Sequence, residues 1–97
     1  MTHEDLKETL RLCAPALKAE LGLAGLAVFG SVARGQATSA SDVDILVDFA
    51  GPADFDRFMD LKERLEAALG VPIDLVTRKA LRPALRSAIE REAIRVA

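Results

Sequence analysis

The sequence predicts an α+β domain in which a small mixed β-sheet is covered by helices. Three observations carry this prediction. Short apolar runs have strand character, the segments around them have helical apolar periodicity, and glycine or proline stands at the junctions. The predicted order along the chain is α-β-β-α-β-α. A chain of 97 residues suits one domain, residues 1–97, and leaves little room for a second.

The first predicted helix spans about residues 4–21. Apolar residues recur there at helical spacing and make one buried stripe: Leu6, Leu10, Cys13, Leu17 and Leu21. Thr2 and Asp5 resemble a capping box at its start, and Gly22 is a plausible stop. Pro15 removes a backbone donor, so we expect it to kink the helix or split it in two.

Two strands are predicted next. Residues 23–29 form an apolar run too short for a helix, which indicates a buried strand. Residues 35–41 are small and polar, as in a loop. In the second strand, residues 43–49, side chains alternate between two faces. One face carries Asp42, Asp44, Leu46 and Asp48, and the other carries Val43, Ile45, Val47 and Phe49.

A second long helix follows, and Gly51 and Pro52 are expected to open it. Pro52 would occupy the first helical position, and Asp54 would complement the helix dipole in the first turn. Its buried stripe is predicted as Phe55, Phe58, Leu61, Leu65, Ala68 and Leu69. Gly70 and Pro72 end it.

The third strand and the last helix complete the predicted order. Residues 73–76 form a short apolar strand. The last helix begins at Pro83 and runs to about residue 92. The apolar residues expected to face inward are Leu81, Leu85, Ala88 and Ile89.

Composition excludes several classes of protein. The formal net charge is −2, which does not fit a strongly basic nucleic-acid binder, so direct nucleic-acid binding is not expected. Apolar runs are shorter than the ~18 residues of a membrane span, and no membrane association is expected. Residues 1–5 lack the pattern of a signal peptide, and the single cysteine excludes an internal disulfide. We expect a cytoplasmic protein.

Gly30 and Ser31 end the first strand and could bind an anion. Glycine lets a phosphate approach the backbone closely, and Ser31 supplies a hydroxyl donor. If residues 31–34 form a helical turn, its backbone N–H groups point at an anion, and Arg34 can add a charged contact. The alternative is that Gly30 and Ser31 only make a turn.

Asp42 and Asp44 lie two residues apart on one strand and therefore share a face. Their carboxylates repel each other, and a cation between them relieves the repulsion. Mg²⁺ prefers carboxylate oxygens, and two such ions can assist both the attacking and the leaving oxygen of a phosphoryl transfer. The alternative is a solvated, charged strand edge.

Asp74 is the one acid in the short apolar strand over residues 73–76. If that strand pairs with the strand of Asp42 and Asp44, Asp74 completes a cluster of three carboxylates. It would then help bind a metal and draw a proton from an acceptor hydroxyl. The alternative places Asp74 in water on the open face of the sheet.

The pattern formed by Gly30–Gly35, residues 41–47 and Asp74 resembles the nucleotidyltransferases of the DNA polymerase β superfamily. The resemblance is closest to the minimal nucleotidyltransferases, the MNT or MntA-like group, and it covers nearly the whole chain. It implies the palm-like nucleotidyltransferase fold, ATP as the donor substrate and two Mg²⁺ ions.

The resemblance also implies roles for individual residues and a biological partner. Asp42, Asp44 and Asp74 would be catalytic and would ligate the metals. Gly30, Ser31 and Arg34 would bind the nucleoside triphosphate. Many MNT proteins act as antitoxins by transferring AMP to a Tyr of a HEPN-family toxin, and such a toxin is the expected partner. The chain has no Tyr, so a Tyr acceptor must belong to another molecule.

Two alternative functions stay open. The chain could be a non-catalytic antitoxin that neutralises its toxin by contact alone. It could also be the catalytic subunit of a small-molecule nucleotidyltransferase of the aminoglycoside type. Oligomerisation is left open by the sequence.

Several other polar residues are set aside. His3 and Asp48 are expected to be solvated, and Cys13 is expected to pack as a small hydrophobe. The basic residues of the C-terminal part fit a charged helix surface and, as a group, are the best candidates for contacting a partner: Arg78, Lys79, Arg82, Arg86, Arg91 and Arg95.

Overall fold

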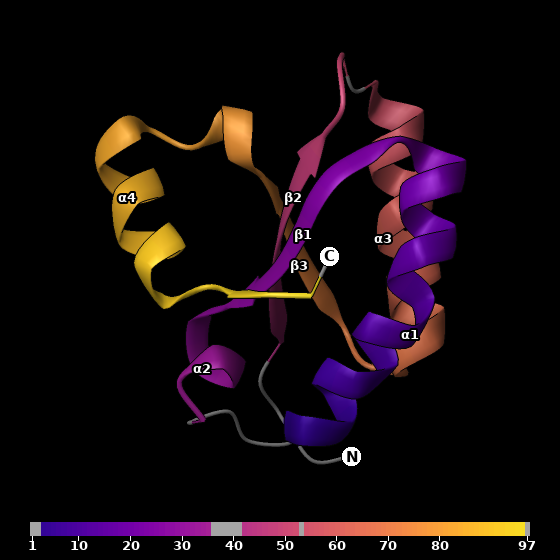
Figure 1. The fold of residues 1–97 in the computed structure, drawn as a ribbon, viewed down its shortest axis with the longest axis horizontal. Helices are drawn as coiled ribbons and strands as arrows, with labels where there is room; N and C mark the ends of the chain where they lie inside the picture. Colours follow the sequence, from indigo (N-terminus) through magenta and orange to yellow (C-terminus); the bar gives the residue numbers. More distant parts are fainter. Residues whose placement is uncertain (1–2, 36–41, 53, 97) are drawn as a thin grey trace.

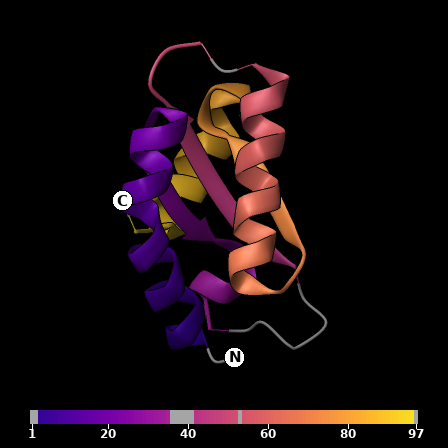
Figure 2. The same cartoon turned by 90° about the vertical axis from the view of Figure 1, so that its right-hand side faces the viewer.

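The computed structural model describes residues 3–35, 42–52 and 54–96, which form three layers. Helices α1 and α3 pack side by side on one face of a β-sheet, and α4 lies on the other face (Figures 1 and 2). In chain order the elements are α1 (His3–Leu21), β1 (Leu23–Phe29), α2 (Gly30–Ala33), β2 (Val43–Phe49), α3 (Phe55–Leu69), β3 (Ile73–Thr77), the 3-10 turn η1 (Arg78–Ala80), α4 (Pro83–Glu92) and β4 (Ile94–Arg95).

The described strands form a mixed sheet in the order β3-β2-β1-β4. β1 pairs with β2 and with β4 in antiparallel fashion, and β2 pairs with β3 in parallel. The parallel pair needs a crossover, which α3 provides across the face that α1 also covers. This confirms the predicted α+β class with a small mixed sheet.

The core lies between the sheet and helices α1 and α3. Leu10, Ile45, Leu61 and Leu65 are fully buried there. No polar or charged residue is buried among those that the structure describes. Because the inward residues of β2 alternate with outward ones, filling this core turns the acids of β2 toward the opposite face of the sheet.

Pro15 does not split the first helix, so this part of the prediction is wrong. α1 is assigned as one helix from His3 to Leu21 with Pro15 inside it. The proline ring removes the hydrogen bond to the carbonyl of Arg11. Both residues are exposed, so water can hydrate that carbonyl while the opposite face of the helix stays packed.

α3 begins later than the sequence predicts. Asp54 is its N-cap, and the Asp54 side chain accepts a hydrogen bond from the backbone N–H of Arg57 at 2.8 Å. Pro52 therefore precedes the helix and does not occupy its first position. Once the cap starts the helix at Phe55, that side chain is left exposed, and Ala68 is exposed too. The buried stripe reduces to Leu61, Leu65 and Leu69, with Phe58 half-buried.

The C-terminal part contains a helix with little burial and a strand that the sequence did not predict. α4 starts at Pro83 as expected, but Leu85 and Ala88 are exposed, and Leu81 and Ile89 are only half-buried. The reason is that α4 lies on the face of the sheet opposite α1 and α3, away from the core (Figure 1). The short β4 then adds an edge to β1.

Two sequence features lie outside the described residues. Thr2 of the expected capping box is one, and residues 36–41 of the expected loop are the other. In the parts of the chain that are described, no helix combines the length and apolar character needed to cross a membrane.

Replacing Leu10 with Ala should lower the free energy of unfolding by about 2–5 kcal/mol, because Leu10 is fully buried and its removal leaves a cavity. Leu12→Ala is the matched control in the same helix: Leu12 is 75% exposed, so this change should stay within about 0.5 kcal/mol. Urea unfolding of both variants measures the difference. Similar losses in the two variants would contradict the assigned core.

Candidate active site

Asp44 and Asp74 lie next to each other on the face of the sheet opposite α1 and α3. The parallel register of β2 and β3 pairs them directly. Asp42 precedes the start of β2 by one residue and is exposed, as is Asp74. The three acids expected to act together therefore lie at one end of two neighbouring strands.

The carboxylate of Asp44 has an unusual electrostatic environment. Its pKa is raised above the ordinary value, first by partial burial and then by the negative charge of Asp74 and a hydrogen bond with it. The charge of Asp42 raises the pKa further, and the positive charge of Arg34 opposes these effects. The acids are therefore close enough for their charges to oppose ionisation of Asp44.

Gly30 begins the turn that contacts Asp44. The antiparallel register pairs Phe29, the last residue of β1, with Asp44, so the chain leaves β1 beside that carboxylate. Gly30 has a φ of +71°, and a Cβ atom there would lie 2.1 Å from Oδ2 of Asp44. The position needs glycine both for its backbone conformation and because the Asp44 carboxylate fills the space of a side chain.

Residues 30–33 continue as the short helix α2, which matches the helical turn considered from the sequence. Ser31 is half-buried in this turn, and Val32 packs into the core. The turn therefore brings Ser31 and Arg34 to the same end of the sheet as the acids.

Glu92 belongs to this region and was not identified from the sequence. Its Oε1 accepts a hydrogen bond from the Gly30 N–H at 3.0 Å, and its Oε2 accepts one from Nη1 of Arg34 at 3.0 Å. These contacts, led by the Gly30 N–H, hold the pKa of Glu92 below its ordinary value. No local pattern marks Glu92, since it lies 58 positions after Arg34.

The donor set suits a hard divalent cation. Asp42, Asp44 and Asp74 offer carboxylate oxygens, the ligands that Mg²⁺ prefers, and a cation would relieve the repulsion that raises the pKa of Asp44. Among the described residues, no three acidic, histidine or cysteine side chains are gathered closely enough to hold a metal by themselves. Asp44 and Asp74 make the close pair, and Asp42 lies further out, so substrate oxygens would have to complete the coordination.

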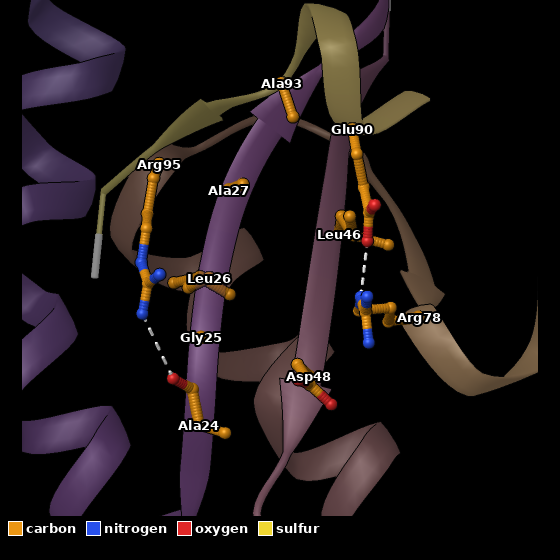
Figure 3. A pocket seen from close by; sticks show the side chains of 10 residues that line it. All are labelled: Ala24, Gly25, Leu26, Ala27, Leu46, Asp48, Arg78, Glu90, Ala93 and Arg95. Atoms are coloured by element: carbon orange, nitrogen blue, oxygen red, sulfur yellow. Dashed lines mark hydrogen bonds and ion pairs between the residues drawn. The ribbon is translucent and has the colours of Figure 1, made fainter. Parts of the chain in front are cut away.

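A hollow of about 410 Å³ lies further along the same face of the sheet, between β1, β2 and the C-terminal segment (Figure 3). Asp48 lines it, as do Arg78 and Glu90, which form an ion pair across its side. Asp42, Asp44 and Asp74 do not line it. Asp48, which was expected to be solvated, is half-buried beside this hollow and lies apart from the acidic group.

The remaining polar residues considered in the sequence have environments that suit structural roles. Cys13 is half-buried against the core, and burial raises the pKa of its thiol, which disfavours a reactive thiolate. The side chain of His3 lies outside the described part of the chain. Several C-terminal arginines bond within the chain: Arg86 to the Leu81 carbonyl, Arg91 to the Ser87 carbonyl and Arg95 to the Ala24 carbonyl.

Comparisons with known proteins agree on one family. The sequence profile of the nucleotidyltransferase domain family matches residues 10–96. The protein adenylyltransferase MntA of Thermococcus cleftensis is 38% identical over 96 residues, which covers 99% of this chain and 97% of that protein. Several relatives from Methanocaldococcus jannaschii are similar, one being 36% identical over 98% of both chains.

Solved structures show the same fold. One proposed to be a minimal nucleotidyltransferase superposes with a TM-score of 0.86 at 41% identity and covers 97% of this chain and 95% of its own. The MNT antitoxin in complex with a tri-AMPylated HEPN toxin of Shewanella oneidensis superposes with a TM-score of 0.67. There the identity is 22%, over 94% of this chain and 71% of that one, so this likeness concerns the fold alone.

Gly30→Ala should destabilise the protein more than Gly35→Ala. Both glycines have a φ of +71°. Among the described residues no atom lies within 4 Å of a Cβ at Gly35, whereas a Cβ at Gly30 meets Asp44. The difference in unfolding free energy isolates that contact, and we expect about 1–3 kcal/mol. Equal losses in urea unfolding would show that Asp44 does not fill the space at Gly30.

Asp44→Asn should increase stability at about pH 7 by roughly 0.5–1 kcal/mol, a modest gain because solvent screens a half-exposed carboxylate. The raised pKa means that the folded state binds the Asp44 proton more tightly than the unfolded state does. The penalty of the ionised wild-type group is therefore absent below the ordinary value near 3.8 and grows as pH rises through the raised one.

Thermal melts of the wild type and Asp44→Asn across this pH range test the effect. The advantage of the variant should disappear on acidification. Asp48→Asn, on the same strand face but away from Asp74, is the control. An advantage for Asp44→Asn that does not change with pH would contradict the repulsion among the acids.

Proposed function

The chain belongs to the nucleotidyltransferase domain family, and on this premise we propose that it transfers AMP from ATP to a hydroxyl group of a partner protein. The observation that carries the proposal is the pairing of Asp44 with Asp74 beside the Gly30 turn. Two acids and a turn with backbone donors meet there, which is the combination that metal-assisted nucleotidyl transfer needs.

Each residue of the site has a proposed task. Asp42, Asp44 and Asp74 would hold two Mg²⁺ ions, which when bound neutralise phosphate charge and lower the barrier to phosphoryl transfer. Ser31 and Arg34 would hold the triphosphate of ATP, with Gly30 shaping the turn that presents them. The positive charge of Arg34, which already acts on Asp44, would also oppose the charge of the phosphates.

The reaction is a displacement at the α-phosphorus of ATP. The acceptor oxygen forms a new bond to that phosphorus, and the bond to the oxygen bridging the α- and β-phosphates breaks. Pyrophosphate leaves with the electron pair of that bond, and the acceptor proton passes to the carboxylate of Asp74. The exposure of Asp74 suits this task, because an acceptor on another molecule can reach it.

We further propose that the acceptor is a Tyr of a HEPN-family toxin and that the chain acts as its antitoxin. The printed sequence has no Tyr of its own. The relative from Thermococcus cleftensis is named for adenylyl transfer to protein, and the Shewanella oneidensis complex pairs an MNT antitoxin with an AMPylated HEPN toxin. The family profile matches residues 10–96, so we assign one nucleotidyltransferase domain to the given sequence, and we propose that the partner holds the acceptor.

The double variant Asp42→Asn, Asp44→Asn should lose transfer by about a thousandfold or more, because the charge that recruits the metals is gone. The assay incubates the chain with Mg²⁺, ATP labelled at the α-phosphate and the protein encoded by the neighbouring gene. Mass spectrometry then locates the added AMP on the partner. Asp48→Asn is the control and should keep full activity, since it lies outside the acidic group.

The outcomes separate the alternatives. Transfer that survives in the double Asn variant would falsify the assignment of the acids. Neutralisation of the toxin without any transfer would favour an antitoxin that acts by contact alone. Labelling of a small molecule, with no label on the partner protein, would favour a small-molecule nucleotidyltransferase.

A further inference from the structure

We propose that Glu92 is a positioning residue for the nucleotide: its carboxylate holds the Gly30 turn and the Arg34 guanidinium in the arrangement that the triphosphate needs. This proposal rests on the proposed function, since it concerns the same triphosphate site. Glu92 is the last residue of α4 and comes from a segment that neither the motif nor the acidic strands include.

Both carboxylate oxygens of Glu92 are used on one short turn. Oε1 accepts from the Gly30 N–H at 3.0 Å and from Nη1 of Arg34 at 3.2 Å, and Oε2 accepts from the same Nη1 at 3.0 Å. A backbone donor and a guanidinium donor are therefore fixed by one group. Such charge-assisted contacts set orientation as well as energy.

The position of Gly30 links the contacts of Glu92 to the acidic residues. Gly30 is contacted from two sides: the Asp44 carboxylate fills the space beside its Cα, and Glu92 accepts its N–H. A rotation of the turn would therefore disturb Asp44 or break the bond to Glu92. Arg34, held by Glu92, also lies near enough to Asp44 to influence its pKa.

Glu92 is itself held by the sheet, which favours positioning over competition with the phosphates. Two residues further on, Ile94 begins β4 and pairs with Val28 of β1, and the Val96 N–H donates to the Leu26 carbonyl at 2.9 Å. These backbone contacts fix the Cα of Glu92 close to the turn, so the carboxylate reaches Gly30 and Arg34 from an anchored position. Glu92 therefore acts as a fixed support beside the turn.

The contact differs from the other ion pairs on this side of the molecule. Glu90 on the same helix pairs with Arg78 and bonds no backbone donor of the Gly30 turn. Glu90→Gln therefore removes one carboxylate and one ion pair of α4 and leaves the turn intact. It is the matched control for Glu92→Gln.

The experiment measures the binding of α,β-methylene ATP in the presence of Mg²⁺. In this analogue a methylene group replaces the oxygen that bridges the α- and β-phosphates, so AMP cannot be transferred from it. Glu92→Gln should raise the Kd of the analogue by about 10-fold, at the low end of the loss found when a group that orients a direct ligand contact is removed. Glu92→Ala should raise the Kd further, and Glu90→Gln should leave it unchanged. The melting temperature of Glu92→Gln should match that of Glu90→Gln.

Two further readouts separate positioning from a merely structural role. Amide hydrogen exchange at Gly30, measured without nucleotide, should accelerate in both Glu92 variants and not in Glu90→Gln. In an Arg34→Gln background, Glu92→Gln should raise the Kd by a smaller factor than it does in the wild type, because part of the effect of Glu92 is to orient Arg34. In transfer assays the KM for ATP should rise more than kcat falls.

The unfavourable results are distinct from one another. Tighter binding in Glu92→Gln would overturn positioning and indicate that Glu92 competes with the phosphates. A lower melting temperature with unchanged Kd and KM would reduce Glu92 to a structural contact. A wild-type chain that binds no analogue and transfers no AMP would overturn the proposed function together with this inference, whereas unaffected Glu92 variants of an active chain would overturn the inference alone.

Discussion

The parallel pairing of β2 with β3 is the contact on which the candidate site depends. It pairs Asp44 with Asp74, which are 30 positions apart in the numbering, and leaves both side chains on the face opposite the core. The pairing in turn requires α3 to cross over the sheet, so the apolar stripe of that helix and the acidic pair follow from one topology. Without the crossover, Asp44 and Asp74 would not meet.

The two faces of the sheet have different roles: one forms the hydrophobic core and the other carries the candidate site. One face packs a wholly apolar interior with α1 and α3, and no polar residue of the described chain is buried there. The other face gathers like charges whose repulsion raises the pKa of Asp44. Such repulsion lowers the stability of the protein when no cation is bound, and a ligand that brings positive charge to this end of the sheet would relieve it.

A domain this small uses its C-terminal segment for two purposes. β4 closes the edge of β1, and Glu92 joins that segment to the Gly30 turn. The ion pair between Arg78 and Glu90 fixes the other side of the same helix. The helix α4, which contributes little to the core, is thus connected through its last turn to the face that carries the acids.

The sequence by itself determined the strands and helices whose signals are local. Period-two alternation in β2, four-residue spacing in α1 and glycine or proline at the ends of α3 and α4 depend on neighbouring residues, so they can be identified without coordinates. The same holds for the acids and the Gly30 turn as candidates. Tertiary structure decided the rest: the exposure of Phe55 and Leu85, the edge strand β4 and the contact of Glu92 with Gly30 and Arg34. These features depend on which segments meet in space. Contacts between residues far apart in the sequence produce no periodic pattern along the chain, so they could not be predicted from it.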